Sequence, residues 1–365
     1  MSPHSNFSIG QEFLAIRSFS MIGWRNCSSG FWTSILARHR PLSHRWKRMS
    51  DAVRAYAFFT DIHGNMTALD AVLDDMLQFA RAREVEHFQR VCLGDSFDGG
   101  PDPAAVFDRL VELGCPHLRG NHEDYLFQCA ANPEDEKFAR PLWKFVPWTV
   151  KRMGEQLSRI KALSSERWAA SADPFFAVHG SIEGNNRVPE FFVQQSALSS
   201  AFVSSHREQQ SSDSAFFFNG HSHYLGRHCQ KKNVWFNCGS VGYPFVEKLP
   251  DHPDAPLATW VWVEVDGRGG MRVFNRRVPY SADVLLRRYI DSGALEICAP
   301  FSFAIAAQSL FNEDVVFPFF QSVKNRHLTP QEMAKLLLIE LEKQNVFERI
   351  NRLLRRAGFE EVDCN

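Results

Sequence analysis

The sequence predicts a layered α/β fold with its functional site at the ends of its strands. Three observations support this fold class. Short apolar segments alternate with longer amphipathic segments from residue 54 onward, and polar side chains beside glycines follow several of the short segments. The last short segments are joined by a glycine-rich turn. Alternating strands and helices are typical of layered α/β domains, in which functional side chains gather where strands end.

The first half of this region is predicted to alternate strands with helices. Ala55–Thr60 is a continuous apolar run that ends at Asp61, and it predicts a strand. In Met66–Ala82, apolar residues recur at spacings of three and four, which predicts an amphipathic helix. The next predicted elements are the strand Phe88–Leu93, the helix Ala104–Leu113 closed by Gly114, and the short strand His117–Arg119.

The second half is predicted to contain a helical insertion, further strands and a hairpin. The insertion covers Pro133–Lys161, where apolar residues again recur at helical spacing. Because a glycine-rich turn joins the last two strands, we expect this half of the sheet to be mixed or antiparallel. The predicted strands are Phe175–His179, Ala215–Phe218 and Val234–Asn237, followed by the hairpin of Trp260–Val265 and Met271–Val278.

The C-terminal segment has strong helix signals. Thr329-Pro330-Gln331-Glu332 has the pattern of a capping box with proline at the first helical position. It predicts a helix through Leu341, and Val346–Ala357 predicts another helix that ends at Gly358. We therefore expect a helical extension over residues 282–365, packed on a main domain formed by residues 49–281.

Residues 1–48 differ from the rest of the chain in composition. They contain seven Arg and Lys residues against a single acid, Glu12, and show no sustained periodicity. This pattern predicts a disordered basic extension. We favour a mis-assigned start, with Met49 as the true first residue, over the alternative of a targeting segment rich in Arg and Ser.

Charge and cysteine content limit the classes of function. The net charge is -1 at pH 7, and the basic N-terminal segment leaves the remaining chain acidic, which argues against nucleic acid as a stable partner. The eight cysteines form no Cys-x-x-Cys pair, which favours reduced thiols in a cytoplasmic protein. Apolar runs fall far short of the ~20 residues that span a membrane. We expect a soluble protein with no membrane partner, either monomeric or oligomeric.

Five short motifs place metal-binding side chains beside glycines at the predicted strand ends. A glycine lets the backbone turn sharply and leaves room for ions and for an anionic substrate. The motifs are Asp61-Ile62-His63-Gly64-Asn65, Gly94-Asp95-Ser96-Phe97-Asp98-Gly99-Gly100-Pro101, Gly120-Asn121-His122-Glu123, Val178-His179-Gly180-Ser181 and Gly220-His221-Ser222-His223.

The donor chemistry of these motifs predicts a metal centre. They supply oxygen and imidazole ligands and no thiolate, a set that suits Mn, Fe, Zn, Co or Ni. Asp61 and His63 are two residues apart, so on an extended segment they would point to the same side, as would His221 and His223. A carboxylate such as Asp95 can bind two cations ~3.5–4 Å apart. Each motif alone is a weak signal, and only their combination supports the prediction.

With these motifs, the region from Arg54 to Tyr280 resembles the calcineurin-like metallophosphoesterase superfamily. Within it, the closest resemblance is to the Asp-x-His-Gly-Asn subgroup of phosphodiesterase and phosphatase-like proteins. Asn237–Pro244 is similar to that subgroup's Asn-Pro-Gly-Ser-Val-Gly loop, with Cys238 where proline is common. The resemblance implies a four-layer α-β-β-α sandwich of two mixed sheets and a hydrolase of phosphate esters.

The resemblance also implies two divalent metal ions and a general acid. Manganese is the first expectation, with Fe, Zn, Co or Ni as alternatives. A metal-bridging hydroxide would attack phosphorus in line. His122 would protonate the leaving oxygen, and Asp98 would orient the imidazole of His122. The implied ligands are Asp61, His63, Asp95 and His223 for the first metal, and Asp95, Asn121, His179 and His221 for the second.

The expected substrate is a small phosphate ester, either a monoester or a diester. Asn65 and Arg119 are candidate substrate-binding residues, with a structural ion pair as an equal alternative for Arg119. Gly99 stands where Ser/Thr protein phosphatases carry arginine, which argues against a phosphoprotein substrate. Substrate specificity would come from the insertions at 133–161 and 183–213, for which no sequence rule predicts a ligand.

A protein-interaction scaffold is the alternative function, because some relatives of this fold have lost catalytic residues. A scaffold could keep metal ligands for stability. It would have no need for His122 beside Asp98. The completeness of the site therefore favours an enzyme.

Overall fold

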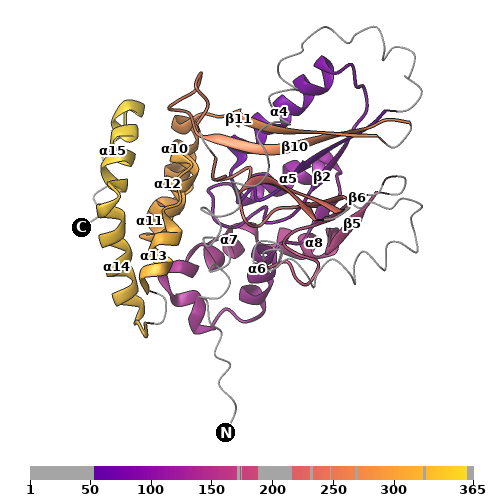
Figure 1. Ribbon diagram of the computed structural model, residues 1–365. Coiled ribbons are helices and arrows are strands. Elements are labelled where there is room, and N and C mark those ends of the chain that lie inside the picture. The colour runs from indigo at the N-terminus through magenta and orange to yellow at the C-terminus, as the bar shows by residue number, and fades with distance from the viewer. Residues whose placement is uncertain are drawn as a thin grey trace.

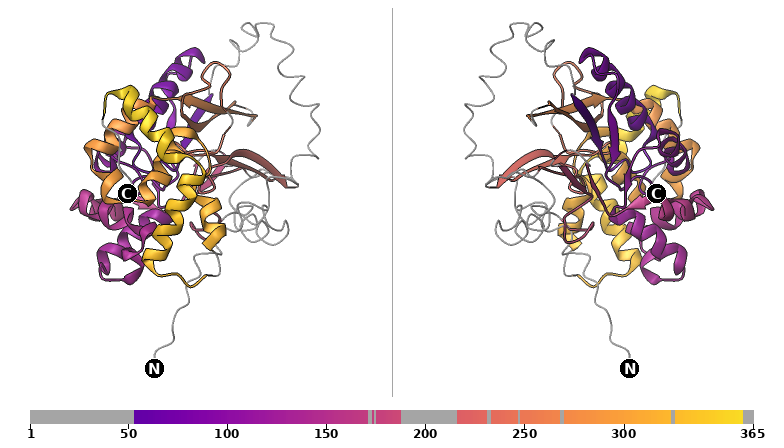
Figure 2. Two further views of the ribbon diagram at one scale, coloured as in Figure 1. Left: turned by 90° about the vertical axis from the view of Figure 1, so that its left-hand side faces the viewer. Right: turned by 90° about the vertical axis from the view of Figure 1, so that its right-hand side faces the viewer.

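The computed structural model describes residues 53–170, 173, 175–187, 216–230, 233–246, 248–267, 270–323 and 326–359. Two sheets face each other, with helices on the outer side of one of them (Figure 1, Figure 2). Each sheet contains both parallel and antiparallel strand pairs. The predicted α/β fold of two mixed sheets with C-terminal helices is confirmed, while the second helix layer of the predicted four-layer α-β-β-α sandwich stays a prediction. The predicted extension at 1–48 and most of the insertion at 183–213 lie outside the described residues.

The first sheet has six strands in the order β11-β10-β1-β2-β3-β4. Strand β1 pairs in parallel with β2 and antiparallel with β10. Because β1, β2 and β3 run parallel, their carboxyl ends lie at the same end of the sheet, and the segments that follow them leave it there. The strands are β1 (Arg54–Phe59), β2 (Gln89–Cys92), β3 (His117–Leu118), β4 (Ser164–Ser165), β10 (Leu257–Val265) and β11 (Met271–Pro279).

The second sheet has five strands in the order β5-β6-β7-β9-β8. Strands β6, β7 and β9 are parallel, so the loops that follow them also lie together at the carboxyl ends of the strands. Strand β8 was not predicted, because Arg227, His228 and Gln230 interrupt its apolar pattern at the edge of the sheet. The strands are β5 (Arg167–Ala169), β6 (Phe175–Val178), β7 (Phe216–Asn219), β8 (Leu225–Gln230) and β9 (Asn233–Cys238).

Strand β1 contributes to hydrophobic cores on both of its faces. Tyr56 and Phe58 belong to the core between the sheets, where the Phe58 ring stacks on Phe218 with ring centroids 4.0 Å apart. Ala57 and Phe59 belong to the core between the first sheet and the helices. A strand that is buried on both faces needs apolar residues at every position, which explains its continuous apolar sequence.

Helices of the first half cover the outer face of the six-stranded sheet and flank its strand ends. Helix α4 contacts β10 and β11, and its bounds match the predicted Met66–Ala82. Helix α5 ends at Gly114 in the left-handed conformation, as expected for a C-terminal cap. The predicted helical insertion contains two short 3-10 turns and helices α7 and α8. The helices are α4 (Met66–Ala82), α5 (Pro103–Leu113), α6 (Asn121–Ala131), η2 (Glu136–Ala139), η3 (Pro141–Trp143), α7 (Phe145–Met153) and α8 (Gln156–Leu163).

The C-terminal helices pack against one another and against the main sheet domain (Figure 1). The capping box at Thr329 and Glu332 is present, as predicted. Helices α10 to α13 were not predicted one by one, and α12 shows why, because it is buried almost all round and lacks an amphipathic pattern. The helices are α10 (Ala282–Asp291), α11 (Ala294–Ile297), α12 (Phe301–Phe311), α13 (Val316–Val323), α14 (Pro330–Lys343) and α15 (Val346–Ala357).

Two contacts connect these helices to the segment after β2. The Tyr289 hydroxyl donates to the backbone carbonyl of Gly99 at 3.3 Å, and Arg288 pairs with Asp102 at 3.1 Å. The C-terminal helices therefore support a loop that lies close to the predicted site.

No helix in the described ranges is both long and apolar enough to cross a membrane.

Packing of α14 can be tested with two substitutions on that helix. Leu341 is fully buried, whereas Ile339 is 38% exposed. Leu341→Ala is expected to lower the free energy of unfolding by ~2–5 kcal/mol, because it leaves a cavity. Ile339→Ala should change it by no more than about 0.5 kcal/mol. Urea unfolding followed by circular dichroism measures both, and equal effects would contradict the packing described here.

Candidate metal centre

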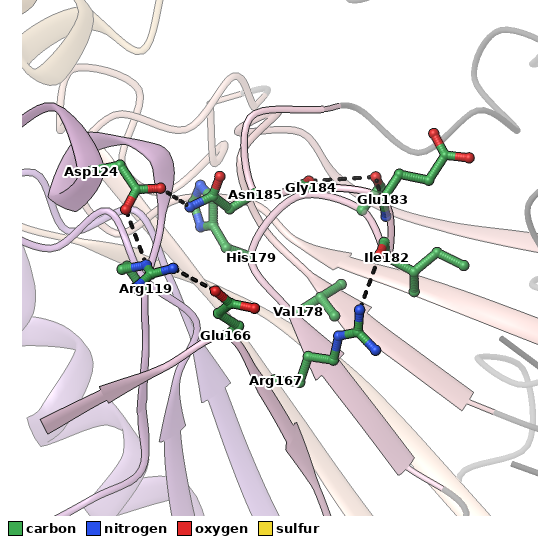
Figure 3. A pocket seen from close by; sticks show the side chains of 11 residues that line it. Arg119, Asp124, Glu166, Arg167, Val178, His179, Ile182, Glu183, Gly184 and Asn185 are labelled. Atoms are coloured by element: carbon green, nitrogen blue, oxygen red, sulfur yellow. Dashed lines mark hydrogen bonds and ion pairs between the residues drawn. The ribbon is translucent and has the colours of Figure 1, made fainter. Parts of the chain in front are cut away.

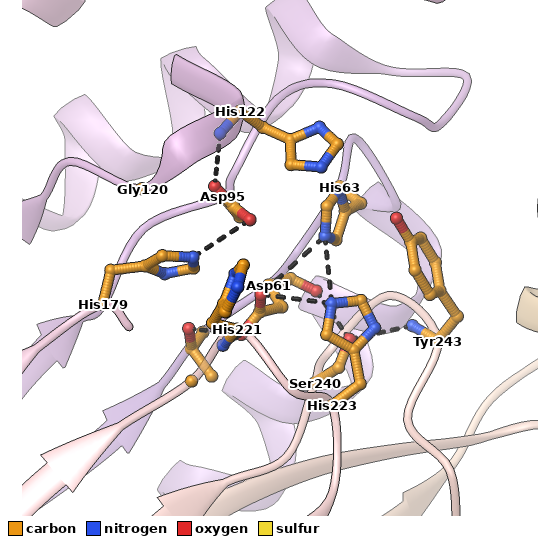
Figure 4. Close-up of polar contacts among 12 residues, drawn as sticks. Asp61, His63, Asp95, Gly120, His122, His179, His221, His223, Ser240 and Tyr243 are labelled. Carbon is orange, nitrogen blue, oxygen red and sulfur yellow. Dashed lines mark hydrogen bonds and ion pairs between the residues drawn. The ribbon is translucent and has the colours of Figure 1, made fainter. Parts of the chain in front are cut away.

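The predicted ligands come together where the parallel strands of both sheets end (Figure 4). The segment after β1 supplies Asp61 and His63, and the segment after β2 supplies Asp95. Asn121 is the first residue of α6, which follows β3. The second sheet supplies the remaining imidazoles, from His179 after β6 and from His221 and His223 after β7.

The backbone conformation of these loops differs from the extended geometry that we predicted. Five of the eight non-glycine residues with positive φ in the described part of the chain are predicted ligands. A left-handed conformation costs such residues ~1–3 kcal/mol each and persists only where the surroundings enforce it. The prediction that an extended backbone aligns the paired ligands is therefore wrong. The five residues and their φ angles are Asp61 (52°), His63 (49°), Asp95 (51°), His221 (67°) and His223 (61°).

Hydrogen bonds from the loop after β9 hold the first of these strained segments. The Ser240 hydroxyl donates to the carbonyl of Asp61 at 2.8 Å, and the Gly242 amide donates to the same carbonyl at 2.9 Å. Ser240 and Gly242 belong to the segment that resembles the subgroup's glycine-rich loop. The role of that loop in this structure is to fix the backbone that carries Asp61.

Asp61, His63 and His223 form the first group that could hold a metal. Oδ1 of Asp61 is buried and accepts no hydrogen bond, and it lies 3.2 Å from Nε2 of His223 and 3.8 Å from Nε2 of His63. These two Nε2 atoms are 3.3 Å apart. A buried carboxylate oxygen facing two imidazole nitrogens is costly without a cation, so this donor set fits a divalent metal.

The tautomer of His63 supports this fit. Nδ1 of His63 lies 2.6 Å from the backbone carbonyl of Asp98, and because a carbonyl only accepts, Nδ1 must carry the proton. Nε2 then presents its lone pair toward Asp61 and His223. Burial, followed by the charges of His122 and His223, lowers the pKa of His63 to about 3 and keeps it neutral. A neutral imidazole is the form that binds metal.

Asp95, His179 and His221 form the second group that could hold a metal. Nε2 of His179 lies 3.0 Å from Oδ2 of Asp95 and 3.2 Å from Oδ1 of Asn121. Nδ1 of His179 donates to the backbone carbonyl of Leu93 at 2.9 Å, which leaves Nε2 facing the site. Together with Asn121, this second group offers a carboxylate, an amide oxygen and two imidazoles, and these donors suit a divalent metal.

The pKa of His179 reflects the negative charge of the carboxylates around it. Burial alone would lower the pKa of His179, but the charges of Asp95 and Asp61 outweigh it and raise the pKa to about 9. The pKa of His221 falls to about 3 because of burial and the neighbouring His179. The carboxylates therefore attract a positive charge to this position, which a divalent cation would supply.

Two backbone hydrogen bonds fix the carboxylates and connect the two groups. The His221 amide donates to Oδ2 of Asp61 at 2.9 Å, so the backbone of a second-group residue holds a first-group ligand. The His122 amide donates to Oδ1 of Asp95 at 2.8 Å. Each carboxylate thus has one oxygen held by the backbone and another facing imidazole nitrogens. The two groups form one continuous site (Figure 4).

The glycines before Asn121 and His221 make room for these carboxylates. A Cβ atom at Gly120 would overlap Oδ1 of Asp95, and one at Gly220 would overlap Oδ2 of Asp61. Any other residue at these positions would displace a predicted ligand. The lack of room for a Cβ atom therefore explains why glycine precedes Asn121 and His221 in the sequence.

His122, Asp98 and Thr149 form a hydrogen-bonded chain beside the first group. Nδ1 of His122 lies 2.8 Å from Oδ2 of Asp98, and the Thr149 hydroxyl donates to Oδ1 of Asp98 at 3.1 Å. Burial opposes a charge on His122, but Asp95 and Asp98 outweigh it and raise its pKa to about 9. The ring lies near His63, with centroids 4.8 Å apart. This arrangement presents a protonated imidazole at the site.

Residues 55–233 match the sequence model of the calcineurin-like phosphoesterase family. This region of the chain belongs to that family. The family prediction is confirmed, while the Asp-x-His-Gly-Asn subgroup stays a prediction. No curated protein matches the chain significantly.

A solved structure supports the same fold. A metallophosphoesterase from Sphaerobacter thermophilus has a TM-score of 0.50 and 18% sequence identity, over 71% of this chain and 99% of that chain. A hypothetical protein from Pyrococcus horikoshii OT3 has a TM-score of 0.49 and 16% identity, over 67% of this chain and 95% of that chain. At these identities the first comparison supports the fold of the phosphoesterase domain and nothing finer.

Two residues of the phosphoesterase site were not singled out by the sequence. Glu123 is fully buried and accepts hydrogen bonds from the amides of Asp95, Ser96 and Gly120 at 2.7–2.9 Å. Its sequence position indicated only an acid in the first turn of a helix. The ring of Tyr243 stacks on His63, with centroids 4.5 Å apart. The bond to Gly120 belongs to a local capping box, but the other contacts join residues from different loops, which no local sequence pattern reveals.

The two predicted substrate-binding residues have structural partners. The Asn65 side chain caps α4 by accepting from the Ala68 amide, and it donates to the Gly242 carbonyl at 3.1 Å. Arg119 pairs with Asp124 at 3.0 Å and with Glu166 at 2.5 Å. The ion-pair alternative stated for Arg119 is therefore present. Substrate contact by Asn65 or Arg119 stays a prediction.

Proposed function

We propose that this protein is a metal-dependent hydrolase of phosphate esters with a dinuclear centre. The observation that carries the proposal is the unsatisfied Oδ1 of Asp61, buried against two imidazoles and next to a second ligand group. Asp61, His63 and His223 would hold one cation. Asp95, Asn121, His179 and His221 would hold the other, with Asp95 as the shared ligand.

The ligand chemistry limits the choice of metal. The donors are carboxylate, amide and imidazole groups, and neither ligand group found in the described residues includes a cysteine. Manganese is our first expectation, with Fe, Zn, Co or Ni as alternatives. When bound, two such cations lower the pKa of water and neutralise charge on the phosphoryl group. Asn121 adds no charge, which limits the negative charge that faces a phosphate.

The residues of the chain have separate tasks in the proposed reaction. His122 donates the proton on Nε2 to the oxygen of the leaving group. Asp98 accepts the Nδ1 proton and holds the ring, and Thr149 fixes the second oxygen of Asp98. The hydrogen bonds of His63 and His179 to backbone carbonyls leave their Nε2 atoms available to the cations that these residues would hold.

Other features of the proposal concern the whole chain. We propose a phosphoesterase domain at residues 49–281 and a helical extension at 282–365. The substrate would be a small phosphate ester in the cytoplasm, with no stable nucleic-acid partner. The acidic balance of the chain beyond residue 48 supports the last of these statements.

Metal removal tests the proposal. Chelator-treated, dialysed protein should hydrolyse p-nitrophenyl phosphate and bis(p-nitrophenyl) phosphate at less than about a hundredth of the starting rate, because metal supplies several kcal/mol of stabilisation. Added Mn, Co or Ni should restore the rate. The rate with added Mg is measured for comparison with the rates that these three metals give. Folded, metal-loaded protein that hydrolyses no ester of a broad panel would instead support the scaffold alternative.

A further inference from the structure

Tyr243 lies against two imidazoles of the first ligand group (Figure 4). Its ring stacks on that of His63 with centroids 4.5 Å apart, and it lies 4.7 Å from the ring of His223. The Tyr243 amide donates to the Ser240 hydroxyl at 3.0 Å, within the loop that also holds the backbone of Asp61. Tyr243 is therefore fixed by the same loop that shapes the first group.

The hydroxyl of Tyr243 differs from those of other buried tyrosines. Tyr56 donates to Asp173 at 2.6 Å. Tyr280 donates to the carbonyl of Ser309 at 2.5 Å. Tyr243 is only 6% exposed, yet within the described part of the chain its hydroxyl has no hydrogen-bond partner. Because a buried tyrosine hydroxyl usually has a partner, this one calls for an acceptor from outside the chain.

The acceptors beside this hydroxyl already receive other donors. A Cβ atom at Gly99 would lie 3.4 Å from the Tyr243 hydroxyl and 3.5 Å from Nδ1 of His63, so the hydroxyl lies beside the Asp98–Gly99 segment. The Asp98 carbonyl accepts from His63, and the Gly99 carbonyl accepts from Tyr289. Both side-chain oxygens of Asp98 accept hydrogen bonds as well. The proton of the Tyr243 hydroxyl is therefore available to a bound ligand.

The hydroxyl lies next to the residues that would protonate the leaving group. Asp98, which orients His122, directly precedes Gly99 in the chain. In Figure 4 the hydroxyl end of Tyr243 is turned toward the side of the site on which His63 and His122 lie. A phosphate ester whose leaving oxygen faces His122 would bring its other phosphoryl oxygens to this part of the site.

The surroundings of the two ligand groups differ. Beside the second group, a polar pocket of about 270 Å³ is lined by His179, and its Arg119 is held by ion pairs with two acids of the same wall (Figure 3). Beside the first group, the rings of Tyr243 and Phe245 lie next to His223, at 4.7 and 5.8 Å between centroids. Of these two rings, that of Tyr243 carries a hydrogen-bond donor.

We propose that the Tyr243 hydroxyl donates a hydrogen bond to a phosphoryl oxygen that stays on phosphorus when the ester bond breaks. The inference rests on the proposed function. His122 would serve the leaving oxygen, and Tyr243 serves the group that remains. A phenol with the ordinary pKa of ~10 stays protonated at neutral pH, so Tyr243 donates a hydrogen bond without giving up its proton. Because a phosphoryl oxygen carries negative charge, the bond is of the strong, charge-assisted kind.

Tyr243→Phe tests the contact, because it removes the hydroxyl and keeps the ring against His63 and His223. In the Mn-loaded protein, kcat/KM should fall at least about tenfold, and by the same factor for alkyl and p-nitrophenyl esters, since both carry these phosphoryl oxygens. The Kd of inorganic phosphate, measured by titration calorimetry, should rise by a similar factor. Values of kcat/KM and Kd within twofold of wild type would overturn the proposal. A loss confined to alkyl esters would also overturn it, by placing the hydroxyl on the leaving oxygen.

Thermal stability separates a substrate contact from a structural one. Tyr243→Phe should keep the Tm and the metal content of the wild-type protein, because it breaks no hydrogen bond seen among the described residues. Tyr56→Phe is the matched control, since the Tyr56 hydroxyl bonds to Asp173 in the core between the sheets. It should lower the Tm by about 2 °C and leave kcat/KM unchanged. An equal loss of Tm in Tyr243→Phe would show a structural hydroxyl and contradict the assignment.

The same assays separate the two proposals. Ester hydrolysis by the wild-type protein, with equal kcat/KM and phosphate Kd in Tyr243→Phe, would overturn the role of Tyr243 and leave the metal centre supported. A wild-type protein that holds its metals and hydrolyses no ester would overturn the proposed function, and this inference with it.

Discussion

Asp95→Asn is expected to lower kcat/KM for phosphoester hydrolysis by ~10³-fold or more, because a shared metal ligand contributes several kcal/mol. Asp95 is almost fully buried, with Oδ1 held by the His122 amide and Oδ2 facing His179. Asparagine has nearly the same shape and can keep the bond to the amide. The substitution therefore removes the negative charge with little change in packing.

The control for Asp95→Asn is the same change at an exposed acid. The side chain of Asp283 is 45% exposed and pairs with Arg356, far along the chain from the ligand loops. Asp283→Asn should leave kcat/KM unchanged. If Asp95→Asn stayed within tenfold of wild type, Asp95 would not be a shared ligand and the dinuclear proposal would lose its main support.

His122→Ala is expected to lower the rate of alkyl phosphoester hydrolysis by ~10²–10⁴-fold, the usual contribution of a general acid. The loss should be far smaller with p-nitrophenyl esters, because p-nitrophenolate is stable without a proton. The substitution should not remove the metals, since the backbone amide of residue 122 still donates to Asp95. Rates with both ester classes and metal content by elemental analysis are the measurements.

Two further variants make this result specific to a proton donor. Asp98→Asn should show the same dependence on leaving group in weaker form, because it disturbs only the orientation of His122. His252→Ala, at an exposed histidine outside the site, should show none. Equal slowing of both ester classes in His122→Ala would mean that His122 binds phosphate and does not act as an acid.

The sequence predicted those features whose causes are local. Met66–Ala82 was predicted with its observed bounds, since its spacing and its cap are written in neighbouring residues. The capping box at Thr329 likewise depends on residues three positions apart. The candidate ligand loops could be singled out because Asp, His and Asn beside glycine follow apolar strands, and the glycines are needed where a carboxylate approaches the backbone.

Features that depend on distant contacts could not be predicted. The left-handed conformation of Asp61 is held by Ser240 and Gly242, about 180 residues later in the chain. Thr149 reaches Asp98 from a helix of the insertion, and nothing in the sequence joins the two. Helix α12 has no polar face because other helices surround it, so its sequence shows no alternation of apolar and polar residues from which a helix could be predicted.

Metal content per chain tests the central claim most directly. Purified protein is stripped with chelator, reconstituted with Mn, freed of unbound metal by gel filtration and measured by elemental analysis. The proposal predicts close to two metal ions per chain in the wild-type protein and fewer in Asp95→Asn. Well under one metal ion per wild-type chain, in protein that is folded, would contradict the dinuclear centre.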